Sequence, residues 1–572
     1  MNKDELLKAI QAVAGEDAAI ELTVPEEEKF GHYATNLAMR LGKKEGKPPL
    51  ELAASLAAAI MEAAPAGLLE KAEAAPPGFI NFWFTNAALQ NEFAAAAVRG
   101  EYGRQETPSR GTVIVEYSQP NIAKMMHVGH LRTTIIGDAL ANILSFLGYQ
   151  VIRWNYLGDW GTQFGKLIAA YKLWGDEEAV RRDPIATLQE LYVRFHDEMK
   201  KDESLEKRGQ EEFKKLEDGD PESRKLWQWF RDESLKEFER AYKALGVHFD
   251  IWIGESFFEP EMRPLVAELV SRGIAKKSEG SLIIDLEAQG LPPALIEKSD
   301  GASLYLTRDI ANIRYRLKEY KPEKILYVVG NEQSLHFEQL FAIAKLLGLD
   351  GAELAHLKYG LVLGEEGKKL ATREGRTILL KDVLGKAITL AREIVEEKNP
   401  ELSPEEKSEV ANAVAVGALK YNDLKENRMT DITFDWGKML DFTGDSGPYL
   451  QYTYARLMSI LRKAEEAGVP HPAHLDGKDV QRLDAPNDLA LMRKIFEFPD
   501  AVARAGERYA TSVLAVYLYK LASAANHFYE TTPIMKDEDA ARRDARLVLV
   551  GVTAHVLKSG MGLLGITALE KI

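Results

Sequence analysis

The spacing of apolar residues predicts a small mixed domain at the start of the chain. Residues 1–110 carry helical patterns at 33–44 and 49–64, followed by a strand-like segment at 76–84. Short helices combined with a strand indicate an N-terminal α+β domain.

The strand-like segment at 76–84 has two different faces. Side chains alternate along a strand, so Phe79, Asn81 and Trp83 share the face opposite to Phe82. Two aromatic rings that flank an amide would form a platform on which unpaired bases stack. The alternative is that a helix of the same domain covers this face, and the sequence leaves both possibilities open.

Residues 111–385 alternate between strand and helix patterns. A β-rich segment, TVIVEY, precedes a helical stripe from about 129 to 147 and a second strand pattern, VIRWNYL, so the three predict a βαβ unit. A long charged helical stretch follows at about 172–280, and strand patterns then return in SLIIDL (281–286), KILYVVG (324–330) and KYGLVLG (358–364). We predict an α/β fold with a Rossmann-type parallel sheet that is interrupted by a helical insertion.

Strand patterns all but disappear after residue 385. Ser403, Pro404 and Glu406 give a strong helix start, with serine as the cap, proline at the first helical position and glutamate at the third. Helical spacing continues through 449–468 to the end of the chain. Residues 386–572 are therefore predicted to form an all-α helical bundle.

Composition narrows the class of protein. The formal net charge of −15 argues against indiscriminate binding of polyanions, so a nucleic-acid partner would need basic residues gathered on local surfaces. The chain has no cysteine, which excludes a disulfide framework and a cysteine-based zinc site. The opening residues lack the pattern of a secretory signal, and no apolar run approaches the roughly 18 residues of a membrane span. We expect a cytoplasmic protein without a membrane partner.

Two histidines and a glycine lie at the predicted start of the first crossover helix. His127 and His130 fall where the first amide groups of a helix and its dipole favour an anion, and Gly129 leaves room for a flat base. Close histidine pairs are more often a cap and a surface residue. The position of this pair at a strand-to-helix turn favours a nucleotide site instead.

The stretch VEYSQPNIAKMMHVGHLRTTIIGDAL, with NYLGDWGTQFG after it, closely resembles the class I aminoacyl-tRNA synthetases and, among them, the arginyl-tRNA synthetases. The segment from His127 to His130 stands where that class has its HIGH motif, which contacts ATP. Further matches follow in the family's order in LYLTRDIA (304–311), GNEQSLHF (330–337), VLGEEGKKLATREG (362–375), GDSGPYLQYTYAR (444–456) and FYE (528–530). The resemblance covers essentially the whole chain.

This resemblance implies a ligase that attaches L-arginine to tRNA(Arg) through an arginyl-adenylate, with transfer to the 2′-hydroxyl of the terminal adenosine. Its substrates would be arginine, tRNA(Arg), and ATP with Mg²⁺, without zinc, and we expect a monomer. An alternative is a catalytically inactive paralogue that binds tRNA. The cysteinyl enzyme of the same class is excluded, because its zinc site needs cysteine.

The resemblance also assigns substrate positions. The expected ATP-binding residues are His127, Gly129, His130, His336 and Lys369. The expected arginine-binding residues are Glu116, Asn121, Tyr305, Asp309 and Gln333. A guanidinium is a planar fork of donors that is never neutral, so such a pocket needs carboxylates in fixed geometry. Tyr305 and Asp309 are four residues apart, which on a helical turn directs both to one place.

The mobile KMSKS loop of this class is altered here. Lys369 matches its first lysine, but Thr372 stands in place of the second. We hypothesise that Lys124, three residues before His127, supplies the missing cation at the α-phosphate. The catalytic group would then be Lys124, His127, His130 and Lys369, and the alternative is that Lys124 is a solvated surface lysine.

Expected RNA contacts lie at both ends of the chain. Phe79 and Asn81 match the positions by which the family's N-terminal domain engages the tRNA D-loop, and Trp83 extends that platform. The helical region resembles the family's anticodon-binding domain, where Tyr454 and Arg456 are candidate contacts. Some tyrosines in a helical bundle will belong to its core.

Overall fold

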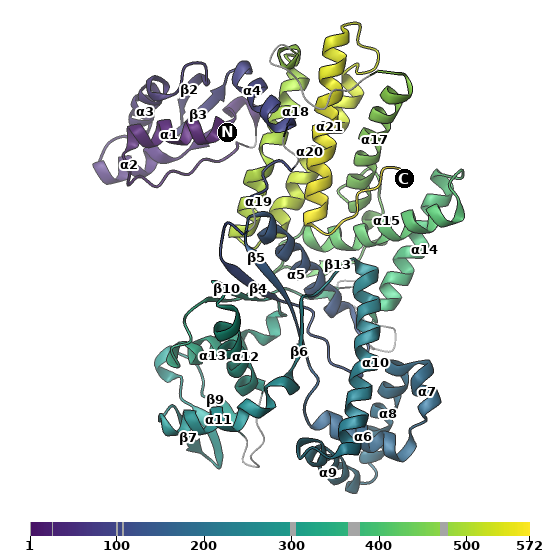
Figure 1. Cartoon of the computed structure of the whole chain (residues 1–572). Coiled ribbons are helices and arrows are strands. Elements are labelled where there is room, and N and C mark those ends of the chain that lie inside the picture. Colours follow the sequence, from purple (N-terminus) through teal and green to yellow (C-terminus); the bar gives the residue numbers. More distant parts are fainter. Residues whose placement is uncertain are drawn as a thin grey trace.

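The computed structural model describes residues 2–25, 27–98, 101–105, 108–297, 305–363, 378–469 and 479–572. Lys369 and Thr372 therefore lie outside the described residues. An N-terminal domain projects sideways from the helical C-terminal domain, and the catalytic domain lies beneath the helices (Figure 1). Within the described ranges no helix combines the length and apolar character needed to cross a bilayer.

The N-terminal domain has a three-stranded antiparallel sheet in the order β1-β3-β2. Its elements are α1 (Asn2–Ala14), β1 (Tyr33–Thr35), α2 (Leu37–Glu45), α3 (Pro49–Ala63), β2 (Leu69–Ala75), β3 (Phe79–Phe84) and α4 (Asn86–Ala97). The helix predicted over 33–44 begins only at Leu37, because its first residues pair with β3. The strand predicted over 76–84 begins only at Phe79, because two prolines and Gly78 form a turn before it.

The two faces of β3 differ as the alternation predicts. Ile80 and Phe82 are fully buried and belong to the domain core. On the other face, Phe79 and Trp83 are half-buried, whereas Asn81 is only 5% exposed between its neighbours on β1 and β2. This face therefore presents its two aromatic rings more than its amide.

The catalytic domain contains a parallel sheet of five strands in the order β11-β10-β4-β5-β6. The strands are β4 (Thr112–Glu116), β5 (Gln150–Leu157), β6 (Ile251–Gly254), β10 (Lys324–Tyr327) and β11 (Glu353–His356). The chain runs from β4 to β5 and β6 on one side, and returns to β10 and β11 on the other. Open α/β sheets bind ligands at the carboxyl ends of the strands where this order reverses, here β4 and β10.

Some predicted strands do not join this sheet. SLIIDL forms β8 (Ser281–Ile284) in a separate antiparallel sheet with β7 (Ala275–Ser278) and β9 (Ala294–Glu297). KYGLVLG contributes only β12 (Val362–Leu363), which pairs with β13 (Ile432–Thr433). These predictions were wrong because a short apolar run does not specify its pairing partner, which tertiary packing selects.

The helical insertion is shorter than the sequence pattern indicated. Within the expected range of 172–280, strand β6 returns to the main sheet and is followed by α11 (Glu259–Ser271). The insertion consists of α6 (Thr162–Trp174), α7 (Glu177–Arg182), α8 (Pro184–Met199), α9 (Ser204–Glu217) and α10 (Pro221–Leu245). Helices α12 (Tyr305–Tyr320) and α13 (Ser334–Leu346) complete the catalytic domain.

The C-terminal region is helical, as predicted. Its long helices are α14 (Leu380–Lys398), α15 (Pro404–Leu424), α17 (Gly447–Glu466), α18 (Pro486–Phe496), α19 (Phe498–Glu507), α20 (Thr511–Thr531) and α21 (Ala540–Leu563), and α16 (Trp436–Met439) is a single turn. The capping box before α15 is confirmed, because Ser403 Oγ accepts the Glu406 amide at 3.2 Å and Glu406 Oε2 accepts the Ser403 amide at 2.9 Å.

Two buried ion pairs join the first crossover helix, α5 (Val128–Phe146), to the helical domain. Arg132 Nε donates to Asp423 Oδ1 at 3.2 Å, and Lys420 Nζ lies 3.7 Å from Asp138 Oδ2. All four side chains are at most 4% exposed. The helix that begins at the histidine pair is thereby held against α15.

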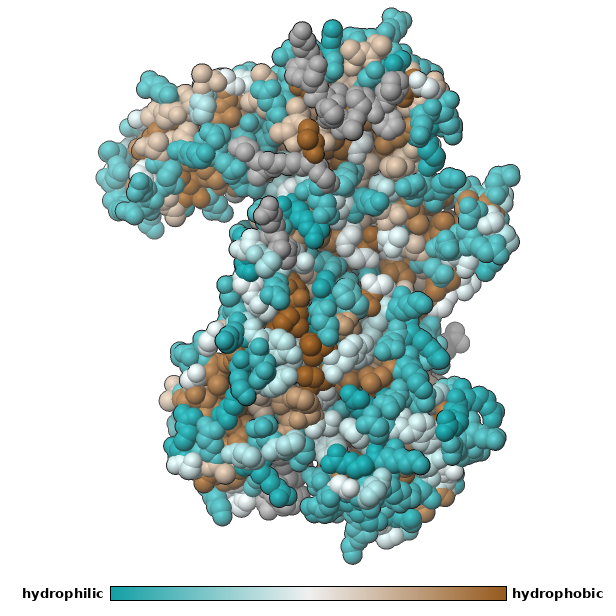
Figure 2. Space-filling model, in the orientation of Figure 1, coloured by the Kyte–Doolittle hydropathy of each residue, from teal (hydrophilic) through white to brown (hydrophobic). Residues whose placement is uncertain are grey.

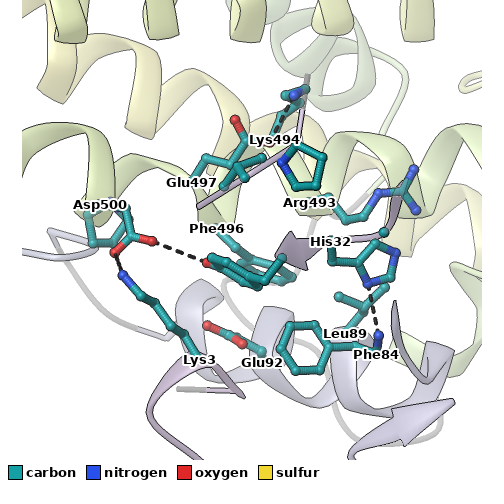
Figure 3. A pocket seen from close by; sticks show the side chains of 15 residues that line it. Lys3, His32, Phe84, Leu89, Glu92, Arg493, Lys494, Phe496, Glu497 and Asp500 are labelled. Atoms are coloured by element: carbon teal, nitrogen blue, oxygen red, sulfur yellow. Dashed lines mark hydrogen bonds and ion pairs between the residues drawn. The ribbon is translucent and has the colours of Figure 1, made fainter. Parts of the chain in front are cut away.

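The N-terminal domain docks on the helical domain through polar contacts. Lys3 Nζ lies 2.5 Å from Asp500 Oδ1, and the Tyr33 hydroxyl donates to Asp500 Oδ2 at 3.2 Å. These side chains line a small cavity of about 60 Å³ between the two domains (Figure 3). Burial, together with the charge of Asp500, raises the pKa of the Tyr33 hydroxyl well above its usual value, so it stays a hydrogen-bond donor.

Candidate active site and RNA-facing surfaces

The two histidines cap the start of helix α5, and a main-chain amide donates to Nδ1 of each ring. His127 Nδ1 accepts the Gly129 amide at 3.1 Å, and His130 Nδ1 accepts the His127 amide at 3.1 Å. An imidazole that accepts at Nδ1 carries its proton on Nε2 when neutral. Burial and the neighbouring His127 lower the pKa of His130 to about 3, so this ring is neutral at pH 7. Each histidine therefore offers an Nε2–H donor.

A cavity of about 340 Å³ lies at the carboxyl ends of β4 and β10. Its lining combines the start of α5 with residues that follow β4, β10 and β11. These residues are His127, Gly129 and His130 of the helix start, Ser118 and Gln119 after β4, Gly330 and Gln333 after β10, and Tyr359 after β11. Two imidazole rings with donors at Nε2 face this space, which suits phosphate oxygens. The amides of Val128, Gly129 and His130 already donate to acceptors within the protein. Of the expected substrate residues, the cavity brings together His127, Gly129, His130 and Gln333.

Asp309 and His336 form a pair between α12 and α13. His336 Nε2 and Asp309 Oδ2 are 2.7 Å apart, and neither residue lines the cavity at the histidine pair. Burial lowers the pKa of His336, but the hydrogen bond and the charge of Asp309 outweigh it, so the net shift is upward. Tyr305, one turn earlier on α12, is 58% exposed. His336 thus contacts a carboxylate, and its predicted contact with ATP stays a prediction.

Glu116 is already paired inside the protein. Its carboxylate accepts hydrogen bonds from Arg316 Nη2 and, at 2.7 Å, from Gln119 Nε2. Arg316 is fully buried, and burial raises the pKa of Glu116 although the arginine opposes the shift. Asn121 lies in the same segment and forms an isolated bridge with Gly158, the glycine of the GDWG stretch. Gly158 permits this approach, because a Cβ there would lie 2.0 Å from Asn121 Oδ1.

Sequence reasoning missed Glu255, which follows β6. Its side chain is buried, its Oε2 has no hydrogen-bond partner, and the nearest cation is Arg308 Nη1 at 3.8 Å. Burial raises the pKa of Glu255 to about 8, opposed by Arg308 and reinforced by Asp309. The buried Tyr156 hydroxyl also lacks a hydrogen-bond partner among the described residues. Burial, together with the charges of Asp309, Glu255 and Glu116, raises its pKa well above the usual value. No local pattern marks Glu255, because only the fold brings it near α12.

Lys124 does not line the cavity at the histidine pair. Its Nζ donates to Gln163 Oε1 at 3.4 Å and lies 5.7 Å from the centre of the Tyr192 ring. Burial lowers its pKa. Lys124 is therefore half-buried, and its predicted contact with the α-phosphate stays a prediction.

The helical domain carries a large groove, of about 1030 Å³, between α17 and the end of α20. Arg456 lies on its wall, where its guanidinium is 4.9 Å from the Tyr452 ring and 5.2 Å from the Tyr529 ring. Lys463 and Lys536 add positive charge. Tyr454 does not reach this groove. It is only 3% exposed, because helical spacing directs it to the core side of α17.

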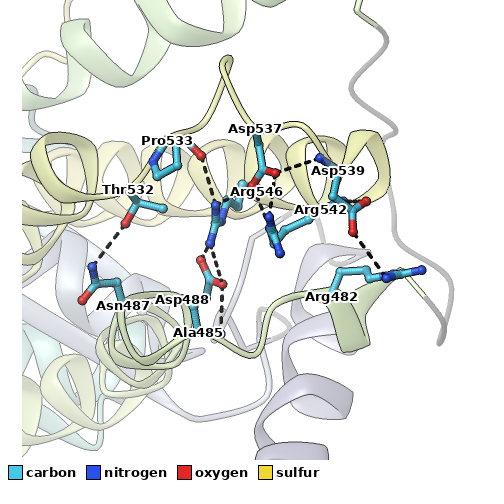
Figure 4. Close-up of polar contacts among 10 residues, drawn as sticks. All are labelled: Arg482, Ala485, Asn487, Asp488, Thr532, Pro533, Asp537, Asp539, Arg542 and Arg546. Carbon is cyan, nitrogen blue, oxygen red and sulfur yellow. Dashed lines mark hydrogen bonds and ion pairs between the residues drawn. The ribbon is translucent and has the colours of Figure 1, made fainter.

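The loop after α20, residues 532–536, forms one wall of this groove. A buried arginine, Arg546, holds this loop through hydrogen bonds (Figure 4). Arg546 donates to both oxygens of Asp488 at 3.0 and 3.3 Å, to Asp537 Oδ2 at 2.7 Å and to the Pro533 carbonyl at 3.0 Å. Arg542 forms a second bidentate pair with Asp537 at 2.7 and 2.8 Å. These bonds hold the loop in place relative to α18 and α21.

Family models match almost the whole chain. Residues 93–436 match "tRNA synthetases class I (R), catalytic domain", residues 450–572 match "DALR anticodon binding domain", and residues 2–84 match "Arginyl tRNA synthetase N terminal domain". With the parallel sheet and the histidine pair at its switch point, these matches define a class I aminoacyl-tRNA synthetase, a class that uses ATP.

Complete proteins match as well. The chain is 43% identical to an arginine–tRNA ligase of Enterococcus faecalis over 100% of both chains, and 41% identical to one of Exiguobacterium sp. over 99% of both. The arginyl-tRNA synthetase structure of Thermus thermophilus superposes with a TM-score of 0.83 at 27% identity, covering 100% of both chains. The structure from Plasmodium falciparum gives 0.81 at 26%, covering 100% of this chain and 98% of that one. The chain belongs to the arginyl-tRNA synthetase family, the arginine–tRNA ligases of class I.

Proposed function

We propose that this enzyme activates L-arginine with ATP and passes the arginyl group to the 2′-hydroxyl of the terminal adenosine of tRNA(Arg). The arginine carboxylate attacks the α-phosphate, the bond to pyrophosphate breaks, and arginyl-adenylate forms. The 2′-hydroxyl then attacks the carbonyl carbon, and AMP leaves. The single observation that supports this most strongly is the pair of imidazoles that caps helix α5 at the switch point of the sheet and presents two donors there.

The histidine pair would stabilise the phosphates during the first step. The Nε2–H groups of His127 and His130 donate to phosphate oxygens, and Gly129 lets the base approach the main chain. These donors are held by the helix turn before ATP arrives, so little reorganisation is needed as charge develops. Lys369 is proposed to act from the loop outside the described residues.

Mg²⁺ is proposed to arrive with ATP. In the described part of the chain no group of three or more His, Asp or Glu side chains is arranged to hold a metal ion. Mg²⁺ commonly binds through substrate phosphates and waters, not through a cage of protein ligands.

Arginine is proposed to bind with its guanidinium toward Asp309 and Glu255 and its amino acid end toward the nucleotide. Tyr305 would cover the side chain, while Asn121 and Gln333 would bind the α-amino group. Glu116 has one protein donor on each oxygen and so can accept another hydrogen bond. Lysine or citrulline would leave acceptors unpaired in such a site, which selects against them.

Lys124 is proposed to take over from the missing second lysine of the KMSKS loop. Among the described residues, one long hydrogen bond, to Gln163 at 3.4 Å, holds its ammonium, so a change of rotamer costs little. A partly desolvated cation would interact strongly with a phosphate. The burial that lowers its pKa is consistent with such a site.

The tRNA is proposed to contact the N-terminal domain and the helical domain. Phe79, Asn81 and Trp83 would face the D-loop, and the groove at Arg456 would take anticodon bases between its tyrosines. The outline of the surface is indented between the projecting N-terminal domain and the catalytic domain (Figure 2). We propose that a monomer works in the cytoplasm, and the domain boundaries near 110 and 385 stay predictions.

Charging of total tRNA with labelled arginine, at saturating ATP and Mg²⁺, tests the proposal. Lysine and citrulline are run in parallel. We expect arginine alone to be attached, and periodate treatment of the tRNA to abolish charging. If tRNA binds tightly but receives no arginine, the protein is an inactive paralogue. In that case no other residue compensates for the loop lysine that Thr372 replaces.

A further inference from the structure

The segment between β4 and α5 is held in a strained conformation. Ser118, Gln119 and Ala123 have φ angles of 74°, 50° and 57°. This left-handed region is unfavourable for residues with a Cβ, and such outliers persist only where surrounding contacts impose them. The segment carries Asn121 and leads directly to Lys124, so its conformation decides where both side chains lie.

Helix α10 of the insertion supplies contacts to two of the strained residues. Ser234 Oγ accepts the Ala123 amide at 2.9 Å, and the hydroxyls of Tyr242 and Ser118 are 2.6 Å apart. Ser234 is fully buried and Tyr242 is 2% exposed, so water cannot replace either bond. Ser234 also donates to the Phe230 carbonyl at 2.6 Å, which fixes its acceptor lone pairs toward the segment.

The same face of α10 also contacts the segment 158–161, which pairs with Asn121 through Gly158. Trp227 Nε1 donates to the Asp159 carbonyl at 2.8 Å, and Arg231 Nε donates to Asp159 Oδ2 at 3.2 Å. The two segments are joined to each other, because the Ile122 amide donates to the Gly158 carbonyl at 3.2 Å. One stripe of a single helix contacts both segments, because its contact residues follow helical spacing: Trp227, Arg231, Ser234 and Tyr242.

We propose that Ser234 and Tyr242 are positioning residues for arginine activation, which hold the segment 118–124 in the strained conformation that presents Asn121 and Lys124. The inference rests on the arginine site proposed above. The helical insertion would then act in positioning the substrate segment, because α10 extends from the outer helices to the carboxyl end of β4.

Ser234→Ala tests this directly. The Ala123 amide loses its buried acceptor, which makes the strained conformation less populated. We expect kcat/KM for arginine to fall about tenfold, with the KM for tRNA unchanged. Tyr242→Phe, which removes only a hydroxyl, should act in the same direction and serves as a second variant if Ser234→Ala does not fold.

A rescue by Ala123→Gly separates positioning from general destabilisation. Glycine adopts positive φ without the Cβ penalty, so the segment no longer needs Ser234 to hold it there. In the Ala123→Gly background we expect Ser234→Ala to cost about threefold or less in kcat/KM, compared with about tenfold alone. A general loss of packing at Ser234 would not respond to a change of backbone strain at residue 123.

Ser223→Ala is the matched control. Ser223 is also a buried serine of α10, but its Oγ donates to Glu212 Oε2 at 3.3 Å and not to the substrate segment. We expect kcat/KM for arginine to stay within about twofold of wild type. Equal effects of Ser223→Ala and Ser234→Ala, or no rescue by Ala123→Gly, would overturn the proposal. Failure of the unmodified enzyme to charge arginine would instead overturn the function on which it rests.

Discussion

The His127 amide donates to Nδ1 of His130 at 3.1 Å, so one imidazole of the pair is oriented by the main chain of the other residue. The second ring accepts from the same turn, through the Gly129 amide, also at 3.1 Å. Each ring therefore combines a structural bond at Nδ1 with a donor at Nε2. The capping role that usually explains such histidines and the phosphate-binding role do not compete, because they use different nitrogens.

The separate roles of Nδ1 and Nε2 can be tested at His130 by substitution with two amide side chains. His130→Asn keeps an acceptor near the position of Nδ1 and loses the Nε2 donor, whereas His130→Gln keeps a donor near Nε2 and loses the cap. We expect His130→Asn to retain stability and to lose about 10²-fold in kcat for adenylate formation. His130→Gln should keep more activity but unfold at lower urea concentration. Stopped-flow adenylate formation and urea unfolding measure the two effects, and a reversed pattern would contradict the assignment.

Lys124→Ala should lower kcat by about 10²-fold or more with little change in the KM for arginine, because the cation acts in the transition state. Lys166→Ala, a neighbouring lysine of the insertion outside the cavity at the histidine pair, is the control. Steady-state charging kinetics give both parameters. An unchanged kcat would end the idea that Lys124 replaces the lysine missing at Thr372.

Arginine affinity should depend on pH through Glu255. Burial raises its folded-state pKa to about 8, so in the free enzyme the protonated form adds stability that is lost as pH rises through 8. A bound guanidinium needs the ionised form, so binding below pH 8 releases a proton. We expect the KM for arginine to rise by up to about tenfold per pH unit below pH 8 and to level off above it.

Glu255→Gln is the control for this pH dependence. It should weaken arginine binding at pH 8.5 and flatten the profile between pH 6.5 and 8. If the KM of the unmodified enzyme is flat over this range, Glu255 does not take part in guanidinium binding. The KM for ATP, measured in the same buffers, separates this effect from general changes with pH.

The loop that lines the groove of the helical domain should depend on the ion pairs of Asp537 for its position. Asp537→Asn removes the charge that pairs with Arg546 and Arg542, so the wall from Pro533 to Lys536 loosens. We expect the KM for tRNA to rise about five- to tenfold while the KM for arginine stays constant. Arg482→Ala, at an exposed ion pair with Asp539, should have no such effect. A rise in both KM values would point to global unfolding instead.

The ion pair between α5 and α15 should matter for stability. Burial raises the pKa of Asp423 to about 6 although Arg132 opposes the shift, so the pair is ionised at neutral pH. Asp423→Asn leaves the Arg132 guanidinium buried with a neutral partner, and we expect a loss of about 3–5 kcal/mol in unfolding free energy. Urea denaturation measures it, with Glu396→Gln at an exposed pair as the control, expected to cost about 0.5 kcal/mol or less. Equal losses of unfolding free energy in the two variants would show that the buried pair stabilises the fold no more than an exposed pair does.

Much of the fold could be predicted because its signals are local. The stripe of α5, the capping box at Ser403 and the helical periodicity of the C-terminal third all repeat within a few residues, and the structure has each of them. The short strands were harder. Strand β6 contains only four residues. Nothing in the sequence around it indicates that it pairs with β5, more than ninety residues earlier.

The sequence by itself determined the class of site, since the strand, the histidine pair and its glycine all lie between Thr112 and His130. Their helix-start geometry follows from local physics. Only the tertiary structure decided which groups surround that site. Glu116 meets Arg316 across 200 residues, and Ser234 meets Ala123 across 111. Such pairings depend on how the sheet and the insertion pack, because burial, and not any local pattern, selects a partner for each desolvated polar group.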